Sequence, residues 1–382
     1  MQDRFSPFVY ERPLPPDEII DRDEETGRLV AHGASGRMVR LVAPRRYGKT
    51  SLLGRVLRDA QRLEGLVPLF VDFDGVVSAA DVAVRLERAD AAQLTEPLRS
   101  RVAELFLGSG LGLSLGALGI SATVWREPAE AVAPRLEALL DAPARAAAET
   151  GRRVLAVWDE FQEVLALDNV DGIMRSRIQH QGERVAYIFS GSEPGMMRRL
   201  FEDRARPLYG QAIPECLGRL ADRDLGPYIE RRFRRGGGSA ADVLSSLLAV
   251  ADGHPQRAML LAHELWVRTP SGSTADMGGW GVALEAVERN VDRESRERWR
   301  LLRINQRRAL RATAGSAGTP YRAESLTAVD LSPGGAAERA VEGLVDLGEL
   351  ERIDAGRYRV VDPLFARWIV KRGEAPDVEP PA

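Results

Sequence analysis

Residues 38–53 read Met-Val-Arg-Leu-Val-Ala-Pro-Arg-Arg-Tyr-Gly-Lys-Thr-Ser-Leu-Leu, and this stretch decides the fold. An apolar strand runs to Val42, a turn closes on Gly-Lys-Thr, and a helix-forming segment follows, which is the context of a phosphate-binding loop. Backbone N–H groups of such a loop surround a phosphate, while Lys49 neutralises phosphate oxygens and the Thr50 hydroxyl ligates Mg²⁺. The residues that we expect to bind nucleotide phosphates are Ala43, Pro44, Arg45, Arg46, Tyr47, Gly48, Lys49, Thr50 and Ser51.

The loop departs from the pattern G-x-x-x-x-G-K-[ST] at its first glycine, which is Ala43 here. If this position needs a positive φ, alanine costs roughly 1–2 kcal/mol of backbone strain. Composition nevertheless supports the loop, because lysine occurs only at Lys49 and Lys371, while the other 51 of 53 basic residues are arginine. A planar guanidinium does not replace a compact ammonium at this position. We therefore favour a phosphate loop over a chance Gly-Lys-Thr in an ordinary strand–helix turn.

Composition describes a folded chain with room for two or three domains. It has 382 residues, of which 44% are hydrophobic and 29% charged, and its net charge of −3 gives no general attraction to nucleic acid or membrane. The single cysteine, Cys216, excludes an internal disulfide and, with four scattered histidines, disfavours a structural zinc site. Residues 1–23 are polar and interrupted by prolines, unlike a signal peptide, so we expect a cytoplasmic protein.

A charge-free stretch over 105–125 is long enough to span a bilayer. Large and small residues alternate in it, which favours strands, so we expect a β-hairpin inserted at about 108–125 that turns near Gly116 and Ala117. Residues 112–116 also match G-x-S-x-G, the nucleophile motif of serine hydrolases. That motif requires a following helix, and another strand pattern follows here, which argues against a hydrolase of this kind.

The second decisive motif is Arg153-Val-Leu-Ala-Val-Trp-Asp-Glu160. Its continuous apolar run predicts a strand buried on both faces of a parallel sheet, with two carboxylates at the end where ligands of such sheets bind. We expect Asp159 to hold Mg²⁺ and Glu160 to act as the general base that polarises the attacking water. The alternative is a solvated strand end, which the preceding Gly-Lys-Thr loop makes less attractive.

A further strand over 184–189 ends in Ser190-Gly191-Ser192. A polar side chain at this end could orient the attacking water or sense the γ-phosphate, and the alternative is a simple Ser-Gly turn. An arginine-rich segment follows, which we interpret either as a solvated face or as the source of an arginine finger that acts in trans. Its arginines are Arg198, Arg199, Arg204 and Arg206.

The second half of the chain is mainly helical. The helical pattern over 220–266 breaks at 236–239 and 253–255, and a Gly-, Ser- and Thr-rich loop over 269–281 indicates a flexible boundary. A helix over 296–310, another that runs to Gly348, and strands over 349–353 and 357–361 describe a winged helix-turn-helix. We therefore expect a nucleotide-binding core over 1–217, a helical lid over 218–283, a winged helix over 284–372 and a disordered tail over 373–382.

Together, these motifs resemble the archaeal-type P-loop ATPases, which are also common in bacteria, in the signal-transducing (STAND) branch of the AAA-like ATPases. The resemblance covers almost the whole chain and implies an α/β fold: an ASCE-type parallel sheet, a helical lid and a C-terminal winged helix. The stretches that carry it are Phe8-Val-Tyr10, Arg22-Asp-Glu-Glu25, Pro44-Arg-Arg-Tyr-Gly-Lys-Thr-Ser-Leu-Leu53, Trp158-Asp-Glu-Phe-Gln162, Gly191-Ser192, Gly253-His-Pro255 and Val361-Asp-Pro-Leu-Phe365.

The resemblance also implies roles for single residues. It places Asp21 and Arg22 near the adenine, makes Ser192 (or Ser190) the sensor at the strand end, and gives His254 and Pro255 lid contacts to the nucleotide. The chain departs from the family at Gln211, where some members have an arginine, which disfavours an arginine finger at that position.

The leading functional hypothesis is a Mg²⁺-dependent ATPase that acts as a molecular switch by moving its lid and winged helix. ATP is favoured over GTP because the guanine motif N-K-x-D needs a lysine, and neither Lys49 nor Lys371 lies in one. The partner is expected to be protein or nucleic acid, not a membrane, and a nucleotide-dependent oligomer is a further option.

Residues 295–372 contain 15 basic and 10 acidic residues, which permits contact with the phosphates of duplex DNA. The expected recognition helix disfavours base reading, since it offers Glu338, Arg339, Glu342 and Asp346 where such helices usually offer Arg, Asn or Gln. The alternative is a packing module that closes the nucleotide site. Two other functions stay open, namely a nucleotide-gated protein scaffold with little turnover and a DNA-binding helper ATPase of the replication or transposition type.

Overall fold

The apolar stretches that end at Val42 and at Trp158 form inner strands of a five-stranded parallel sheet. In the computed structural model, which describes residues 6–63, 65–93 and 129–373, the strand order is β2-β3-β4-β1-β5. Because β1 and β3 flank β4, the loops that follow them open at the same edge of the sheet. The strands are β1 (Met38–Val42), β2 (Leu66–Asp72), β3 (Arg153–Asp159), β4 (Val185–Gly191) and β5 (Ile213–Cys216).

Helices cover both faces of the sheet, which explains why β3 is apolar throughout. Leu155 and Val157 face a core shared with α1 and α2, whereas Ala156 and Trp158 face a core that includes the aromatic rings of Tyr187 and Phe189. On the first face lie α1 (Asp23–Ala34) and α2 (Lys49–Arg62); on the second lie α3 (Ala79–Gln93), α5 (Ala129–Thr150), α6 (Val170–Ile178), α7 (Pro194–Glu202) and the 3₁₀ segment η2 (Phe161–Ala166).

The predicted hairpin at about 108–125 lies outside the described residues, and so does the predicted tail except for its first residue. The domain boundaries therefore remain proposals.

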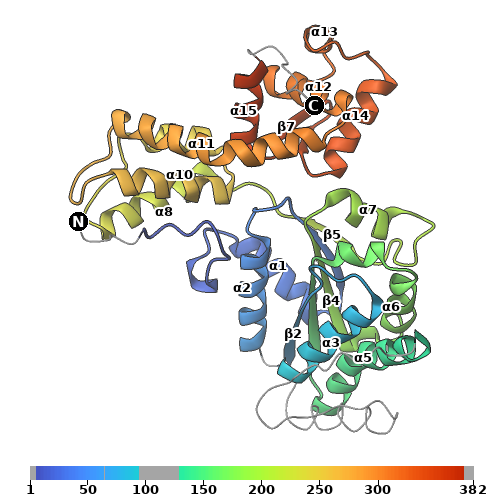
Figure 1. The fold of residues 1–382 in the computed structure, drawn as a ribbon. Coiled ribbons are helices and arrows are strands. Elements are labelled where there is room, and N and C mark those ends of the chain that lie inside the picture. Colours follow the sequence, from blue (N-terminus) through green and yellow to red (C-terminus); the bar gives the residue numbers. More distant parts are fainter. Residues whose placement is uncertain (1–5, 64, 94–128, 374–382) are drawn as a thin grey trace.

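A helical region follows β5 and packs on a core of its own (Figure 1). The N-terminal segment contributes to this core through Phe8, whose ring centroid lies 5.4 Å from that of Phe233 and 6.2 Å from that of Trp266. The N-terminal segment therefore bridges the α/β part and this region, which we name the lid region after the prediction for residues 218–283. Its helices are α8 (Asp222–Arg235), α9 (Leu244–Ala251), α10 (Pro255–Arg268) and the first half of α11 (Met277–Leu301).

Helix α11 corrects two sequence expectations. It begins inside the stretch predicted as a flexible loop, because the Asp276 side chain caps it by accepting a hydrogen bond from the Gly279 N–H at 2.7 Å. It also crosses the boundary placed between residues 283 and 284. The helix predicted over 296–310 is in fact the end of α11 and the start of α12, separated by Leu302 and Arg303.

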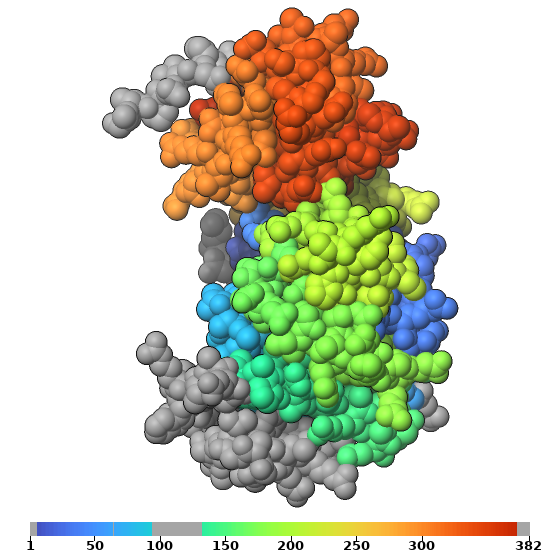
Figure 2. Space-filling model, turned by 90° about the vertical axis from the view of Figure 1, so that its right-hand side faces the viewer, coloured from blue at the N-terminus to red at the C-terminus, as the bar shows by residue number. Residues whose placement is uncertain are grey.

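The C-terminal region consists of three helices, an antiparallel β-hairpin and a last helix. Figure 2 shows this region, in orange to red, stacked on one end of the α/β part. Its elements are α12 (Ile304–Gly315), α13 (Ala323–Ala328), α14 (Gly335–Asp346), β6 (Leu350–Asp354), β7 (Arg357–Val360) and α15 (Pro363–Gly373).

Candidate functional site

The loop between β1 and α2 has the geometry of a phosphate-binding turn. Helix α2 begins at Lys49, so the unpaired N–H groups of its first turn face the edge of the sheet. The left-handed positions are Arg46, with a φ of 70°, and Gly48, with a φ of 84°. Ala43 is not among them; it is fully buried and donates its N–H to the Gly191 carbonyl at 3.3 Å. The backbone strain considered for alanine at this position therefore does not arise.

Most side chains of the loop point away from the turn. Arg45 pairs with Glu193 at 3.1 Å and Arg46 with Glu294 of α11 at 2.7 Å. The Ser51 hydroxyl accepts the Leu14 N–H at 2.9 Å. The partners of these side chains lie outside the loop. Its backbone, Lys49 and Thr50 are therefore the groups available to a phosphate.

Tyr47 connects the loop to the rest of the molecule. Its side chain is almost fully buried, and its hydroxyl lies 3.3 Å from a carboxylate oxygen of Glu351 on β6 and 3.5 Å from the Val361 carbonyl. The Arg219 guanidinium lies 6.0 Å from the Tyr47 ring centroid. The predicted contact of Tyr47 with nucleotide is therefore restricted to its backbone.

Lys49 brings the two sequence motifs together. Its Nζ lies 2.5 Å from Asp159 Oδ1 and 2.7 Å from Glu160 Oε1, and the Thr50 hydroxyl donates to Asp159 Oδ2 at 3.3 Å. Lys49 and Asp159 are buried, with side chains 6% and 4% exposed. A buried lysine is stable here because two carboxylates compensate its charge.

Glu160 occupies a left-handed backbone position, with a φ of 48°, between β3 and η2. Its second carboxylate oxygen, Oε2, accepts hydrogen bonds from Gln162 Nε2 at 2.6 Å and from the Ser192 hydroxyl at 2.8 Å. Burial raises the pKa of Glu160, but the charge of Lys49 and the bonds from Gln162, Lys49 and Ser192 outweigh it and lower the pKa below its ordinary value. The carboxylate is therefore ionised at neutral pH.

The two serines at the end of β4 have different surroundings. Ser192 contacts Glu160, whereas Ser190 is fully buried and its hydroxyl has no hydrogen-bond partner within the part of the chain that the structure describes. Gln162, to which the sequence reasoning gave no role, donates to Glu160 and accepts the Ser192 N–H. The signal that could have found it is its spacing, two residues after Glu160 in the motif Asp-Glu-Phe-Gln.

Arg22 and Asp21 lie at the start of α1, both in left-handed conformation. The Arg22 guanidinium is buried and donates to Glu25 at 2.9 Å and to the Gly218 carbonyl at 2.5 Å. The Asp21 carbonyl accepts from Arg55 of α2 at 3.3 Å. This segment therefore joins α2 to the chain that leaves β5, without a described hydrogen bond to the loop over 43–51.

His254 is buried at the start of α10, next to Pro255. Its Nδ1 caps the helix by accepting the Arg257 N–H at 3.3 Å, and its ring packs edge-on against Tyr47, with centroids 5.0 Å apart. Burial lowers the pKa of His254 to about 3, so the ring is neutral. The structure thus brings His254 to the phosphate loop through Tyr47.

A buried ion-pair network joins the lid region to the C-terminal region. Asp362 accepts two hydrogen bonds from Arg257, at 3.0 and 2.5 Å, and one from Arg298 at 2.9 Å. Arg298 also reaches Glu349 at 2.5 Å. Burial alone would raise the pKa of Asp362, but Arg257 and Arg298 hold it well below its usual range. This network makes the two regions one packed unit.

The arginines considered for a finger divide into two groups. Arg198 pairs with Asp346 and Arg206 with Asp171, so these two are engaged within the chain. Arg199 and Arg204 are exposed. Gln211 donates to the Tyr209 carbonyl at 3.3 Å.

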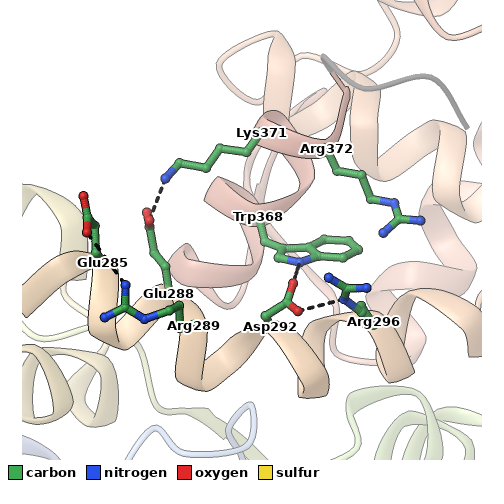
Figure 3. Close-up of a pocket in the computed structure, with 8 residues that line it drawn as sticks. All are labelled: Glu285, Glu288, Arg289, Asp292, Arg296, Trp368, Lys371 and Arg372. Atoms are coloured by element: carbon green, nitrogen blue, oxygen red, sulfur yellow. Dashed lines mark hydrogen bonds and ion pairs between the residues drawn. The ribbon is translucent and has the colours of Figure 1, made fainter.

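A second concave site lies between α11 and α15, away from the loop over 43–51 (Figure 3). It has a volume of about 510 Å³. Its carboxylates have partners within the site: Glu288 accepts from Lys371 at 2.6 Å, and Asp292 accepts the Trp368 Nε1–H at 2.8 Å. It carries no part of the predicted chemistry.

Two further properties concern only the described residues, 6–63, 65–93 and 129–373. No group of three or more His, Cys, Asp or Glu side chains is arranged to hold a metal ion. Among the helices described, none combines the length and the apolar character needed to cross a membrane.

The fold is similar to that of the Walker-type ATPase PABY2304 of Pyrococcus abyssi. The two chains are 18% identical, with a TM-score of 0.67, and the match covers 94% of this chain and 99% of that chain. The ORC2 protein of Aeropyrum pernix, in ADPNP–ADP complexes, is 15% identical, with a TM-score of 0.58 and 97% of each chain covered. The ADP form of that protein is 14% identical, with a TM-score of 0.52 and 96% of each chain covered.

No protein-family model matches the sequence, and no curated protein matches it either. At identities this low the structural likeness establishes the fold: a P-loop NTPase sheet of the AAA-like type, followed by a helical C-terminal part, as the sequence predicts.

Proposed function

We propose that the loop over 43–51, Asp159 and Glu160 form the active site of a Mg²⁺-dependent ATPase. The observation that carries this proposal is the convergence of Lys49 on both carboxylates, at 2.5 and 2.7 Å, where the N-terminus of α2 meets the end of β3. A helix N-terminus, an ammonium group and two carboxylates are the groups that phosphoryl transfer from a nucleotide to water requires.

Thr50 and Asp159 fit the ligand preferences of Mg²⁺. A hydroxyl oxygen and a carboxylate oxygen lie 3.3 Å apart, and both are hard oxygen donors. When bound, Mg²⁺ would neutralise charge on the β- and γ-phosphate oxygens. Asp159 would then exchange its ion pair with Lys49 for contact with the cation, and Lys49 would turn to the phosphates.

Glu160 is the proposed general base. The oxygen of water bonds to the γ-phosphorus, the bond from this phosphorus to the bridging oxygen breaks, and Glu160 takes the proton of the water, which yields ADP and phosphate. The lowered pKa of Glu160 keeps the carboxylate ionised at neutral pH, which is the form that a general base needs. Ser192, which donates to Glu160 at 2.8 Å, is the proposed sensor.

Adenine is the base that we propose, since the chain has no N-K-x-D motif. The segment of Asp21 and Arg22 remains the proposed adenine side of the site, because it lies against α2 and Gly218. His254 and Pro255 would act indirectly, by starting α10 and supporting Tyr47.

We further propose that nucleotide state is transmitted to the C-terminal region, read as a winged helix in a STAND-like switch. Two neighbouring residues of the phosphate loop support this idea. Arg46 pairs with Glu294 of α11, and Tyr47 reaches Glu351 of β6. A phosphate that rearranges the loop would therefore displace contacts on both elements.

A nucleotide-gated scaffold with little turnover is the second candidate, and one observation favours it. In this structure Lys49 contacts Glu160 Oε1, while Gln162 and Ser192 both donate to Oε2, so each oxygen of the proposed base is held by hydrogen bonds within the chain. Turnover then requires that ATP draws Lys49 away.

The test is Mg²⁺-dependent ATP turnover, together with ATP binding by calorimetry, for the native protein, Lys49→Ala and Glu160→Gln. We expect native turnover, loss of binding in Lys49→Ala, and retained binding with at least 100-fold lower turnover in Glu160→Gln, roughly the contribution of a general base. Native binding without turnover would leave the scaffold.

Stimulation by duplex DNA would support contact through residues 295–372, and sedimentation with ATP would reveal a nucleotide-dependent oligomer.

A further inference from the structure

Gln162 is a deeply buried polar side chain at the end of β3, and only 1% of it is exposed. Its Nε2 donates to Glu160 Oε2 at 2.6 Å, and its Oε1 accepts the Ser192 N–H at 3.3 Å. Because one end of the amide must donate and the other must accept, these two partners fix its orientation. Gln162 therefore joins the ends of β3 and β4 directly beside the proposed base.

The room for this amide depends on Gly191. A Cβ at Gly191 would lie 2.6 Å from Gln162 Oε1 and 2.5 Å from Met197 Sδ, both closer than real contacts. The φ of Gly191 is not positive, so space and not backbone conformation requires the glycine here. Strand β4 thus comes close enough to hold the amide in one position.

The two oxygens of Glu160 have different kinds of partners. Oε1 contacts the Lys49 ammonium, which a bound phosphate would compete for, whereas Oε2 contacts Gln162 and Ser192, which are held by the sheet. Departure of Lys49 would therefore free Oε1 alone and leave the carboxylate anchored through Oε2.

We propose that Gln162 is a positioning residue of the ATPase reaction, which holds Glu160 by Oε2 so that Oε1 faces the attacking water. This inference rests on the proposed function. It assigns the proton-accepting atom, Oε1, and makes the amide of Gln162 responsible for its direction.

The bond from Gln162 becomes more important once nucleotide is bound. When Lys49 contacts phosphate, the bonds from Gln162 and Ser192 to Oε2 would remain and would hold the carboxylate. Loss of Gln162 would therefore leave Ser192 as the one described side chain that holds this oxygen.

The experiment compares Gln162→Leu and Gln162→Glu with the control Gln181→Leu. Gln181 is also buried; its Nε2 donates to the Leu140 carbonyl at 2.6 Å and its Oε1 accepts the Tyr187 hydroxyl, so its replacement likewise removes one donated and one accepted bond, before the start of β4 and remote from Glu160. We expect Gln162→Leu to lower kcat roughly 10- to 100-fold, as misplacement of a reacting group does, with KM for ATP almost unchanged. Gln162→Glu keeps the size of the side chain but places a like charge beside Oε2, and it should also lower kcat with KM for ATP almost unchanged.

The second readout needs no nucleotide. In protein labelled with ¹³C at glutamate carboxyls, with Glu160→Gln for assignment, the carboxyl chemical shift of Glu160 at about pH 7 should change in both Gln162 variants and keep its native value in Gln181→Leu. If Gln162→Leu does not fold, the nearly isosteric Gln162→Glu keeps both readouts accessible.

The outcomes separate the two proposals. Active native protein whose Gln162 variants keep both kcat and the native carboxyl chemical shift of Glu160 would overturn the positioning role and leave the ATPase intact. Inactive native protein would overturn the ATPase, and the positioning role with it.

Discussion

Two buried carboxylates in the α/β part have opposite environments. Asp159 contacts Lys49 and Thr50. Asp90, on α3, is 1% exposed, and neither of its oxygens has a hydrogen-bond partner within the described residues. Burial, followed by the negative charge of Glu87, raises the pKa of Asp90 well above its usual range. Asp159 fits a functional site, whereas Asp90 is a cost to stability.

Replacing Asp90 by leucine should stabilise the protein, and more so at higher pH. The native state holds the Asp90 proton above the unfolded pKa of about 4, so the free energy of unfolding falls as pH rises from there through the raised native pKa. Asp90→Leu removes this loss, and we expect a gain of about 1–3 kcal/mol at pH 7.5, smaller at pH 5. Urea unfolding at both pH values measures it.

Asp168→Leu is the control for this prediction, because Asp168 is exposed. Its effect should stay within about 0.5 kcal/mol at both pH values. A loss of stability in Asp90→Leu, or a gain independent of pH, would show that Asp90 is ionised and compensated in the native state.

At the scale of elements, the end of α14 packs against the start of α7, three residues after Ser192. A Cβ at Gly195 of α7 would lie 2.6 Å from Asp346 Cβ and 2.8 Å from its Cα. Asp346 also pairs with Arg198 of α7. Asp346, an exposed acidic residue of α14, therefore contacts the α/β part. The other exposed acids of this helix, Glu338 and Glu342, would repel DNA phosphates.

Gly195→Ala should separate α14 from α7, because the added Cβ would lie only 2.8 Å from the backbone Cα of Asp346, which is closer than real contacts. We expect faster hydrogen exchange over 194–202 and 335–346 in this variant. The control is Gly281→Ala in α11, where an added Cβ meets nothing within 4 Å. Equal exchange in both variants and the native protein would mean that the contact contributes nothing to docking.

Much of the core could be predicted from sequence because its signals are local. The continuous apolar run of β3 predicted burial on both faces, and Lys49, Asp159 and Glu160 lie together as their motifs indicate. The start of α11 was missed because glycines follow its cap, Asp276. Contacts such as that between Gln162 and Ser192 join segments that are distant in the sequence, and the periodicity of apolar residues does not predict such contacts.

At the scale of the whole molecule, α11 belongs to two cores. Val287 and Val291 pack in the core of the lid region, and Trp299 packs in that of the C-terminal region. Asp362 adds the ion pairs to Arg257 and Arg298. We therefore expect these regions to move as one body over the α/β part.

Three sets of contacts join this body, the lid region together with the C-terminal region, to the edge of the sheet. They are made by Arg46 and Tyr47 from the loop over 43–51, by the start of α7, and by Arg219. The last donates to the carbonyls of Val360 at 2.9 Å and of Val361 at 2.8 Å. Because the loop over 43–51 supplies one of these contacts, a nucleotide bound there, as proposed, would act directly on the C-terminal region.

The central claim is that a phosphate bound at residues 43–51 moves this body, and one distance tests it. Spin labels at Arg88→Cys and Ser332→Cys, in a Cys216→Ser background, report the separation of α3 from the segment before α14. With Mg²⁺ and ATP in a Glu160→Gln background we predict a shifted distance distribution, and in Lys49→Ala none. An unchanged distribution with bound ATP would contradict the account.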